Sequence, residues 1–150
     1  MKTQQRILKF RAWDIKTKKF IATDFHILGE VMCFGLIEQY IDENMCGAEN
    51  SLDRWNDIVI TQFTGLQDKN KKDIYEGDIV KGYDKDYQPK SEKFSYIGEI
   101  TYENSYFCLS PFKLFILSDL DILGNIFENP NLLDKDNDCY DKYFKHKNDN

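Results

Sequence analysis

The segment FTGLQDKNKKDIYEGDIV, residues 63–80, places strand, turn and corner signals in a fixed order. An apolar strand ends at Gly65, where the missing Cβ permits backbone angles that other residues avoid. Asp68 follows, and its carboxylate can accept hydrogen bonds from backbone amides of the turn that it opens. A short strand then reaches Gly77, a predicted bulge or corner, and Asp78, which is placed to cap exposed amides there. The segment therefore predicts strands joined by defined turns, which is a pattern of folding rather than of catalysis.

The turn inside this segment departs from the tightest hairpin type. Asn-Gly favours a two-residue turn, because both positions of that turn must adopt positive φ. Here Asn70 is followed by Lys71, so we expect a longer loop between the two strands.

The composition indicates a β-rich globular chain. Its 150 residues suffice for one domain with an elaboration, and 41% of them are hydrophobic against 31% charged. Aromatic residues make up 15% of the chain, and they favour the half-buried surface of a sheet. Short strand patterns separated by turn signals, about every 8–12 residues, predict a small barrel or sandwich.

The N-terminal segment predicts a β-hairpin. Residues 7–13 and 20–27 read as strands, and the polar residues 14–19 between them read as their turn. A third strand is expected at 30–36 and one short helix at 36–45, where apolar residues recur at helical spacing. Further strand patterns occupy residues 57–66, 73–83, 94–109 with a turn at 103–105, 112–120 and 121–133.

These patterns predict a mainly β chain in three parts with at most one or two short helices. We expect an N-terminal β elaboration with an acidic segment over residues 1–57 and a small β-barrel core over residues 58–133. Residues 134–150 are polar and are expected to form a disordered tail. The predicted core residues are Phe63, Ile79, Val80, Ile97, Ile100, Phe107, Leu109, Ile122 and Ile126.

Three blocks of the sequence together resemble the YopX family of phage and prophage proteins. They are KFRAWDIKTKKF at 9–20, QFTGLQDKNKKDIYEGDIV at 62–80 and ILGNIFENPNLL at 122–133, and their order and spacing also match. The resemblance implies an SH3-like small β barrel with an N-terminal β elaboration, and it transfers no catalytic residue. The residues of the shared structural motif are Trp13, Asp14, Thr64, Gly65, Leu66, Asp68, Tyr75, Gly77, Asp78, Gly124, Asn125, Asn129 and Pro130.

The cysteines and the N-terminus indicate a cytoplasmic location, and the family resemblance implies that the cell is a bacterial host. Four cysteines are spread along the chain without a Cys-x-x-Cys pair, which argues against a disulfide framework or a zinc site. The first residues contain no apolar signal core, and no run of about 18 apolar residues could span a membrane. We therefore expect no secretion signal and no membrane association.

Charge is unevenly distributed. Residues 1–20 carry a net charge of +6, whereas residues 24–57 carry −7 and the whole chain −6. This overall acidity argues against a general nucleic-acid binder, although the basic N-terminal strand leaves nucleic-acid binding open. The basic stripe consists of Arg6, Lys9, Arg11, Lys16, Lys18 and Lys19. The favoured interpretation is that this strand lies against the acidic segment or decorates a solvated face.

A second candidate for nucleic-acid binding is a segment in which aromatic and basic residues alternate, because bases can stack on such a surface. It comprises Lys81, Tyr83, Lys85, Tyr87, Lys90, Lys93, Phe94 and Tyr96. Acids stand among these residues, so a solvated loop is the favoured interpretation.

Four acids in the segment quoted above are candidate metal ligands. They are Asp68, Asp73, Glu76 and Asp78. They do not fit a calcium loop, because Asp73 and Ile79 stand where glycine and glutamate are required. A carboxylate site for magnesium, as in phosphodiester-cleaving enzymes, stays open as a minor alternative. Turn caps are the commoner use of such acids, so we expect no cofactor.

Nucleophilic catalysis has little support. The chain lacks a nucleophile elbow and a phosphate-binding loop, and a Cys33–His26 pair is the nearest arrangement to a catalytic dyad. His146 lies in the polar tail.

The leading functional hypothesis is a non-enzymatic phage or prophage accessory protein that acts through protein–protein contact with an unknown partner. The alternatives are a nucleic-acid-associated barrel and, with less support, a metal-dependent phosphodiester enzyme. A homo-oligomer is also predicted, because an apolar hairpin face must be covered within the chain or by a neighbour. That predicted face consists of Leu8, Phe10, Ala12 and Phe20.

Overall fold

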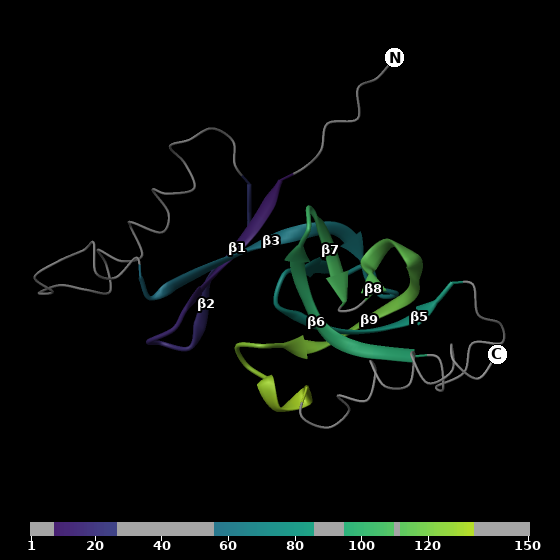
Figure 1. Cartoon of the computed structure of the whole chain (residues 1–150). Helices are drawn as coiled ribbons and strands as arrows, with labels where there is room; N and C mark the ends of the chain where they lie inside the picture. Colours follow the sequence, from purple (N-terminus) through teal and green to yellow (C-terminus); the bar gives the residue numbers. More distant parts are fainter. Residues whose placement is uncertain (1–7, 27–55, 86–94, 110–111, 134–150) are drawn as a thin grey trace, which may run out of the picture. The chain divides into compact units, whose positions relative to one another are not determined.

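The computed structural model describes residues 8–26, 56–85, 95–109 and 112–133 (Figure 1). Backbone contacts divide the chain into two units, residues 1–63 and 64–150, and strand β3 (Ile58–Gln67) passes from one into the other. The strand expected at 30–36, the helix expected at 36–45 and the polar tail lie outside the described residues. The three-part division at residues 57/58 and 133/134 therefore stays a prediction.

The first unit contains the predicted N-terminal hairpin. Strand β1 (Lys9–Asp14) lies between β2 (Lys19–His26) and β3, and both pairings are antiparallel. The hairpin turn is fixed by Asp14, whose Oδ1 accepts hydrogen bonds from the amides of Lys16 (2.8 Å) and Thr17 (3.1 Å).

The two faces of β1 differ from the expected division into apolar and charged sides. Arg11 is buried rather than solvated, and its Nε donates to Thr61 Oγ1 over 3.0 Å. Its guanidinium lies 4.8 Å from the ring of Phe20, and that ring contacts Trp13 edge-on at 4.9 Å between centroids. Phe20 therefore lies on the face of Arg11 and Trp13, whereas the sequence placed it with Leu8 and Phe10. Burial is tolerated because Thr61 and the ring replace water around the guanidinium.

The second unit is built from a curled antiparallel sheet in the order β8-β7-β6-β5-β9. Its strands are β5 (Asp78–Asp84), β6 (Ser95–Glu103), β7 (Tyr106–Leu109), β8 (Phe112–Lys113) and β9 (Leu117–Asn125). Strand β4 (Asp73–Tyr75) pairs with β3, and the helices among the described residues are the three-residue turns η2 (Leu114–Ile116) and η3 (Pro130–Leu132). The mainly β class is confirmed as a half-barrel of curled antiparallel sheets, and the finer SH3-like assignment stays a prediction.

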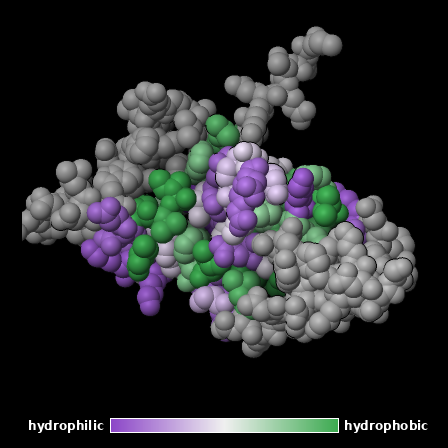
Figure 2. Space-filling view, viewed as in Figure 1, coloured by the Kyte–Doolittle hydropathy of each residue, from purple (hydrophilic) through white to green (hydrophobic). Residues whose placement is uncertain are grey.

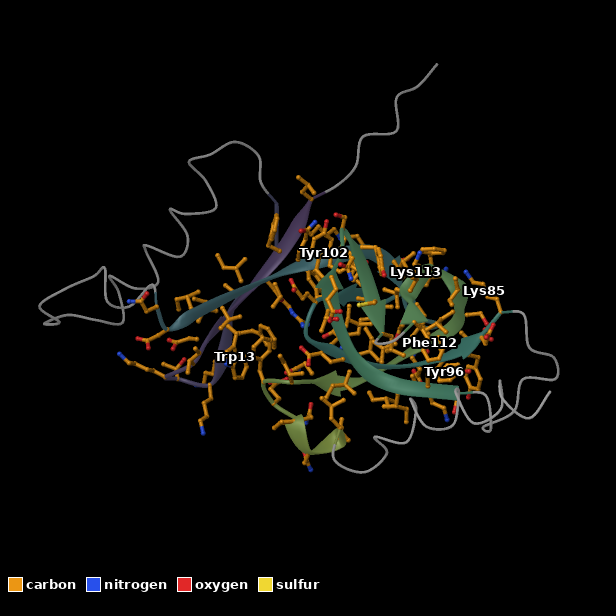
Figure 3. The ribbon with its side chains drawn as sticks, viewed as in Figure 1. Trp13, Lys85, Tyr96, Tyr102, Phe112 and Lys113 are labelled. Atoms are coloured by element: carbon orange, nitrogen blue, oxygen red, sulfur yellow. The ribbon has the colours of Figure 1, made fainter. Side chains whose placement is uncertain are left out.

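The core of the second unit lies inside this curl (Figure 3). Of the nine predicted core residues, Ile79, Val80, Ile100 and Leu109 are fully buried. Phe107 and Ile122 pack against the core while partly exposed. The other three are only half-buried, and they are Phe63, Ile97 and Ile126. The predicted set lacked six buried members of this core cluster, which are Ile74, Tyr96, Phe112, Leu114, Leu117 and Leu120.

The two glycines in the quoted segment adopt the backbone conformation that their positions suggested. Gly65 has φ +87° and Gly77 has φ +78°, both in the left-handed region. Gly77 is a corner, since its amide donates to the Ile100 carbonyl (2.8 Å) and its carbonyl accepts from the Ile126 amide (2.9 Å). The longer loop expected at Lys71 is also present, because residues 68–72 separate β3 from β4, and Lys71 itself has φ +65°.

Gly65→Ala should destabilise the protein by about 1–2 kcal/mol, the cost of placing a Cβ in the left-handed region. The effect isolates backbone strain, because no atom would lie within 4 Å of the new Cβ. Gly98→Ala is the matched control, since its φ is not positive and its new Cβ would meet Leu109 at an ordinary 3.5 Å. Chemical denaturation measures both, and an equal loss for the two variants would contradict strain at Gly65.

Candidate functional site

Asp68 organises the turn between β3 and β4 in the way that the sequence predicted. Its Oδ1 accepts hydrogen bonds from the amides of Asn70 and Lys72, each at 2.8 Å. The turn is closed by the Asp68 amide bonded to the Lys72 carbonyl (2.8 Å) and by the Lys71 amide bonded to the Asp68 carbonyl (2.9 Å). The carboxylate is thus committed to the backbone of its own turn.

Asp78, the first residue of β5, and Asn125, the last residue of β9, also accept hydrogen bonds from nearby backbone amides. Asp78 Oδ2 accepts from the Tyr75 amide at 2.8 Å, and Asn125 Oδ1 accepts from the amides of Phe127 (3.0 Å) and Glu128 (2.9 Å). Asp78 and Asn125 are direct partners in the register of β5 and β9. The second and third sequence blocks of the motif therefore meet at one corner of the sheet.

The other motif residues of the third block shape the same corner. A Cβ on Gly124 would lie 2.5 Å from Asn129 Oδ1, so a larger residue here would have to displace the Asn129 side chain. Pro130 follows as the first residue of η3, a position that needs no amide donor.

In the second block, Thr64 Oγ1 donates to the Ile74 carbonyl (2.9 Å) and accepts from the Leu66 amide (3.1 Å). These contacts join the end of β3 to β4.

The four turn acids do not assemble into a metal site. Within the part of the chain that the structure describes, no group of three or more His, Cys, Asp or Glu side chains lies close enough to hold an ion. Asp68 and Asp78 are bonded to backbone amides, and Asp73 accepts from Gln67 Nε2 at 2.8 Å. This donor set does not fit the magnesium site considered from the sequence.

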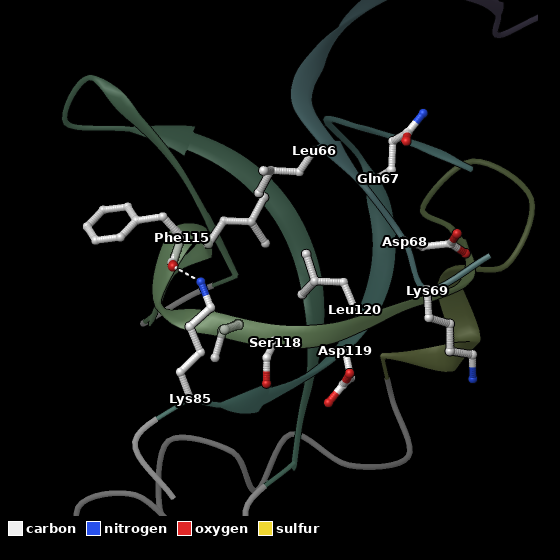
Figure 4. A pocket seen from close by; sticks show the side chains of 11 residues that line it. Leu66, Gln67, Asp68, Lys69, Lys85, Phe115, Ser118, Asp119 and Leu120 are labelled. Atoms are coloured by element: carbon white, nitrogen blue, oxygen red, sulfur yellow. Dashed lines mark hydrogen bonds between the residues drawn. The ribbon is translucent and has the colours of Figure 1, made fainter. Parts of the chain in front are cut away.

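A groove of about 360 Å³ lies in the second unit beside the Asp68 turn (Figure 4). Its lining comes from three separate segments of the chain, residues 66–69, residue 85 and residues 114–120. The lining residues are Leu66, Gln67, Asp68, Lys69, Lys85, Leu114, Phe115, Leu117, Ser118, Asp119 and Leu120. Leu66 and Asp68 are among the predicted motif residues, but no sequence pattern predicted the groove.

The groove combines a buried apolar floor with exposed apolar walls. Leu114, Leu117 and Leu120 are buried members of the core, whereas Phe115 is 59% exposed and Leu66 is 37% exposed. Figure 2 shows hydrophobic residues at the surface among hydrophilic ones on the face turned to the viewer. Leucines that belong to the core and line a groove give it a rigid base.

A bulge in β9 forms part of the groove. The register of β9 against β5 shifts between Lys81 and Tyr83, whose partners are Asp121 and Ser118. Asp119 lies in this shift with φ +48°, an uncommon conformation for a residue other than glycine. Such bulges redirect side chains next to functional sites, and this one is a local feature that no turn signal in the sequence marked.

The Asp68 turn is tied directly to the groove floor. The Lys69 amide donates to the Leu120 carbonyl at 2.8 Å, and the Lys69 ammonium forms an ion pair with Asp121 at 2.7 Å. The hydrogen bond to Asp121 raises the pKa of Lys69. On the other side, the ammonium of Lys85 donates to the Phe115 carbonyl and its amide donates to the Ile116 carbonyl (3.2 Å). Both ends of the groove are therefore held by backbone contacts.

Three of the six residues in the basic N-terminal stripe make contacts within the first unit. Besides the buried Arg11, Lys9 lies 5.3 Å from the ring of Phe63, and Lys16 forms an ion pair with Asp57 at 2.7 Å. Asp57 belongs to the acidic segment, so this pair agrees with the interpretation that basic and acidic residues meet within the chain.

The alternating aromatic and basic segment is also not a continuous platform. Tyr96 is buried, and its ring packs on Phe112 at 4.0 Å between centroids, so it is not available to stack on a base. Lys81 and Tyr83 do lie together, at 5.6 Å from ammonium to ring, while residues 86–94 lie outside the described residues.

The structure also bears on two further expectations from the sequence, which concern the cysteines and membrane-spanning helices. Cys108 is a free, buried thiol, and its Sγ lies 3.1 Å from Thr101 Oγ1. In the described ranges, no helix has the length and apolarity needed to cross a membrane. The side chains of Cys33, His26 and His146 lie outside the description.

Asp68→Asn should lower stability at neutral pH. Burial would raise the pKa of the Asp68 carboxyl, but hydrogen bonds from Lys72 and Asn70 outweigh it and lower the pKa below 3.8. Its folded pKa therefore lies below its unfolded pKa, so the carboxylate stabilises the fold above about pH 4 and loses this effect as the pH falls through the folded pKa. Thermal melts from pH 7 to pH 2 should show the gap between wild type and variant closing at the acid end.

Asp119→Asn is the matched control for this experiment, because Asn tolerates the positive φ of an exposed position. A gap of equal size at every pH would contradict the role of the Asp68 charge.

Glu99→Gln should raise stability at pH 7. Burial, together with repulsion from the Glu76 carboxylate, raises the pKa of Glu99. Its folded pKa thus exceeds its unfolded pKa, so the charged form destabilises the fold at neutral pH and the penalty disappears as the pH falls through the folded pKa. Melting temperatures should differ most at pH 7 and converge near pH 4. Glu103→Gln, on the exposed end of the same strand, is the control, and an equal gain there would refute the explanation.

The comparisons with known proteins agree with the sequence resemblance. No curated protein matches the chain. Among solved structures, the chain resembles the crystal structure of protein EF1440 from Enterococcus faecalis, with 26% identity and a TM-score of 0.53. The match covers 86% of this chain and 99% of that chain. A family model described as YopX protein matches residues 9–134, which include all three motif blocks and the groove. The chain therefore belongs to the YopX protein family.

Proposed function

We propose that this protein is a non-enzymatic accessory protein of a phage or prophage that acts by binding a protein partner in its groove. The observation that carries the proposal is Phe115, a large aromatic side chain that is 59% exposed beside a floor of buried leucines. The phage or prophage origin and the bacterial host rest on the family resemblance, and the cytoplasmic location stays a prediction from the sequence.

The groove has the features of a protein-docking site. Hot spots of interfaces are aromatic or apolar anchors near an apolar centre, surrounded by polar groups that exclude water. Here Phe115 and Leu66 are the exposed anchors, and Gln67, Lys69 and Asp119 belong to the polar rim. A volume of about 360 Å³ lies at the lower end of the range for ligand sites and fits one or two side chains of a partner.

The non-enzymatic part of the proposal is supported by how the candidate catalytic groups are used. Asp68 and Asp78, the acids most suited to a metal, accept hydrogen bonds from turn amides. Cys108 is buried against Thr101 and does not line the groove. Self-association through the hairpin face that includes Leu8 and Phe10 stays a further prediction.

Phe115→Asp should abolish capture of the partner by the tagged protein from infected or lysogenic cells, because a charge replaces the apolar anchor. Tyr102→Asp is the matched control, since Tyr102 is a similarly exposed aromatic residue (54%) that does not line the groove. Captured proteins are quantified by mass spectrometry after nuclease treatment.

A partner that survives nuclease, is lost with Phe115→Asp and is kept with Tyr102→Asp is the expected result. Retention by both variants would overturn docking in the groove. Loss of every captured protein on nuclease treatment would instead favour the nucleic-acid alternative.

A further inference from the structure

Phe115 is flanked by two lysines that form no ion pair with any residue in the described ranges. Lys113 Nζ lies 5.0 Å from the centre of the Tyr106 ring and 5.8 Å from that of Phe115. Lys85 directs its ammonium to the Phe115 carbonyl, as Figure 4 shows. Lys69, the other lysine that lines the groove, does have an acidic partner, Asp121.

No acidic side chain of the described residues neutralises these two lysines. A ring or a carbonyl oxygen attracts an ammonium without cancelling its charge, and each ammonium has three hydrogens to donate. Lys113 uses aromatic faces, and Lys85 uses one carbonyl. Both ammonium groups can therefore still donate to an anionic group that approaches Phe115.

The charge of the groove is polarised along its length. Lys85 lines the Phe115 end of the groove. Lys113 does not line it, but its ammonium lies next to the groove, 5.8 Å from the centre of the Phe115 ring. The lining carboxylate of Asp119 is directed away from Phe115 (Figure 4). Lys69, at the end formed by the Asp68 turn, is neutralised by Asp121. A carboxylate beside Phe115 would therefore meet cations, and the same group at the opposite end would not.

We propose that the groove selects a partner segment in which an apolar side chain is flanked by carboxylates. The apolar side chain enters the groove against Leu66 and Phe115, and an adjacent Asp or Glu of the partner receives hydrogen bonds from Lys113 and Lys85. This inference rests on the docking function proposed above and names the chemistry of the partner. It also gives a local reason why an acidic protein, with a net charge of −6, would accept an acidic ligand.

Three synthetic peptides test this selectivity on the full chain. Each is acetylated, amidated and seven residues long with a central leucine, and the flanking residues are all glutamate, all glutamine or all lysine. Amide chemical shifts in nuclear magnetic resonance titrations report both the binding site and the affinity. The glutamate peptide should shift amides of residues 66–69 and 112–120 and should bind most tightly of the three.

Two variants separate charge from apolar contact. Lys113→Gln should weaken binding of the glutamate peptide about two- to fivefold, the factor expected for one exposed ion pair, and leave the glutamine peptide unchanged. Lys81→Gln is the matched control, because it removes a lysine from a similar ring contact outside the groove. Phe115→Ala should weaken binding of every peptide.

Equal affinity for the glutamate and glutamine peptides, or an unchanged affinity in Lys113→Gln, would overturn the carboxylate preference. Docking of a protein partner would still stand in that case if Phe115→Asp loses the captured protein. Tighter binding of the lysine peptide, or no shift with any peptide, would likewise overturn the inference.

Discussion

The hydrogen bonds between the Asp68 carboxylate and its own turn are the constraint on which the groove depends. They fix residues 68–72 in one conformation, and the same turn bonds to β9 through the Lys69 amide and the Leu120 carbonyl. Leu120 is at once a core residue and part of the groove floor. Without the carboxylate, the amides of Asn70 and Lys72 would need other partners, and the turn would lose its fixed position against β9. A local polar interaction thus determines the shape of a surface assembled from distant segments.

Buried polar side chains that accept hydrogen bonds from nearby backbone amides recur in this chain, at places where a strand reverses or bends. Asp14, Asp68, Asp78 and Asn125 are all buried, and each accepts hydrogen bonds from backbone amides close to it in sequence. The burial of a carboxylate costs free energy unless hydrogen bonds compensate for it, and backbone amides supply that compensation here. All four lie in the three sequence blocks that resemble the family, so these blocks describe how the sheets turn. This explains why the most recognisable residues of the sequence give little information about chemistry.

The turns and the fold class could be predicted from the sequence because their signals are local. Gly65, Gly77 and Asp68 each act within a few residues, and the structure contains the predicted hairpin, loop and corner. The groove could not be predicted in this way, since residues 66–69, 85 and 114–120 meet only after the sheet has curled. The uniformly apolar run 114–117 contains no alternation, so η2 and the exposure of Phe115 left no periodic signal. Arg11 was misassigned for a related reason, because its partners Thr61 and Phe20 come from two neighbouring strands.

Amide hydrogen exchange in Asp68→Ala tests the dependence of the groove on this turn most directly. Protection should fall at Asn70 and Lys72 and, together with them, at Lys69, whose amide is bonded to the Leu120 carbonyl. The amide of Ile15, bonded to the Asp57 carbonyl in the first unit, should keep its protection. Loss of protection at Asn70 and Lys72 with Lys69 unchanged would contradict the account, because the turn would then not be what holds the groove against β9.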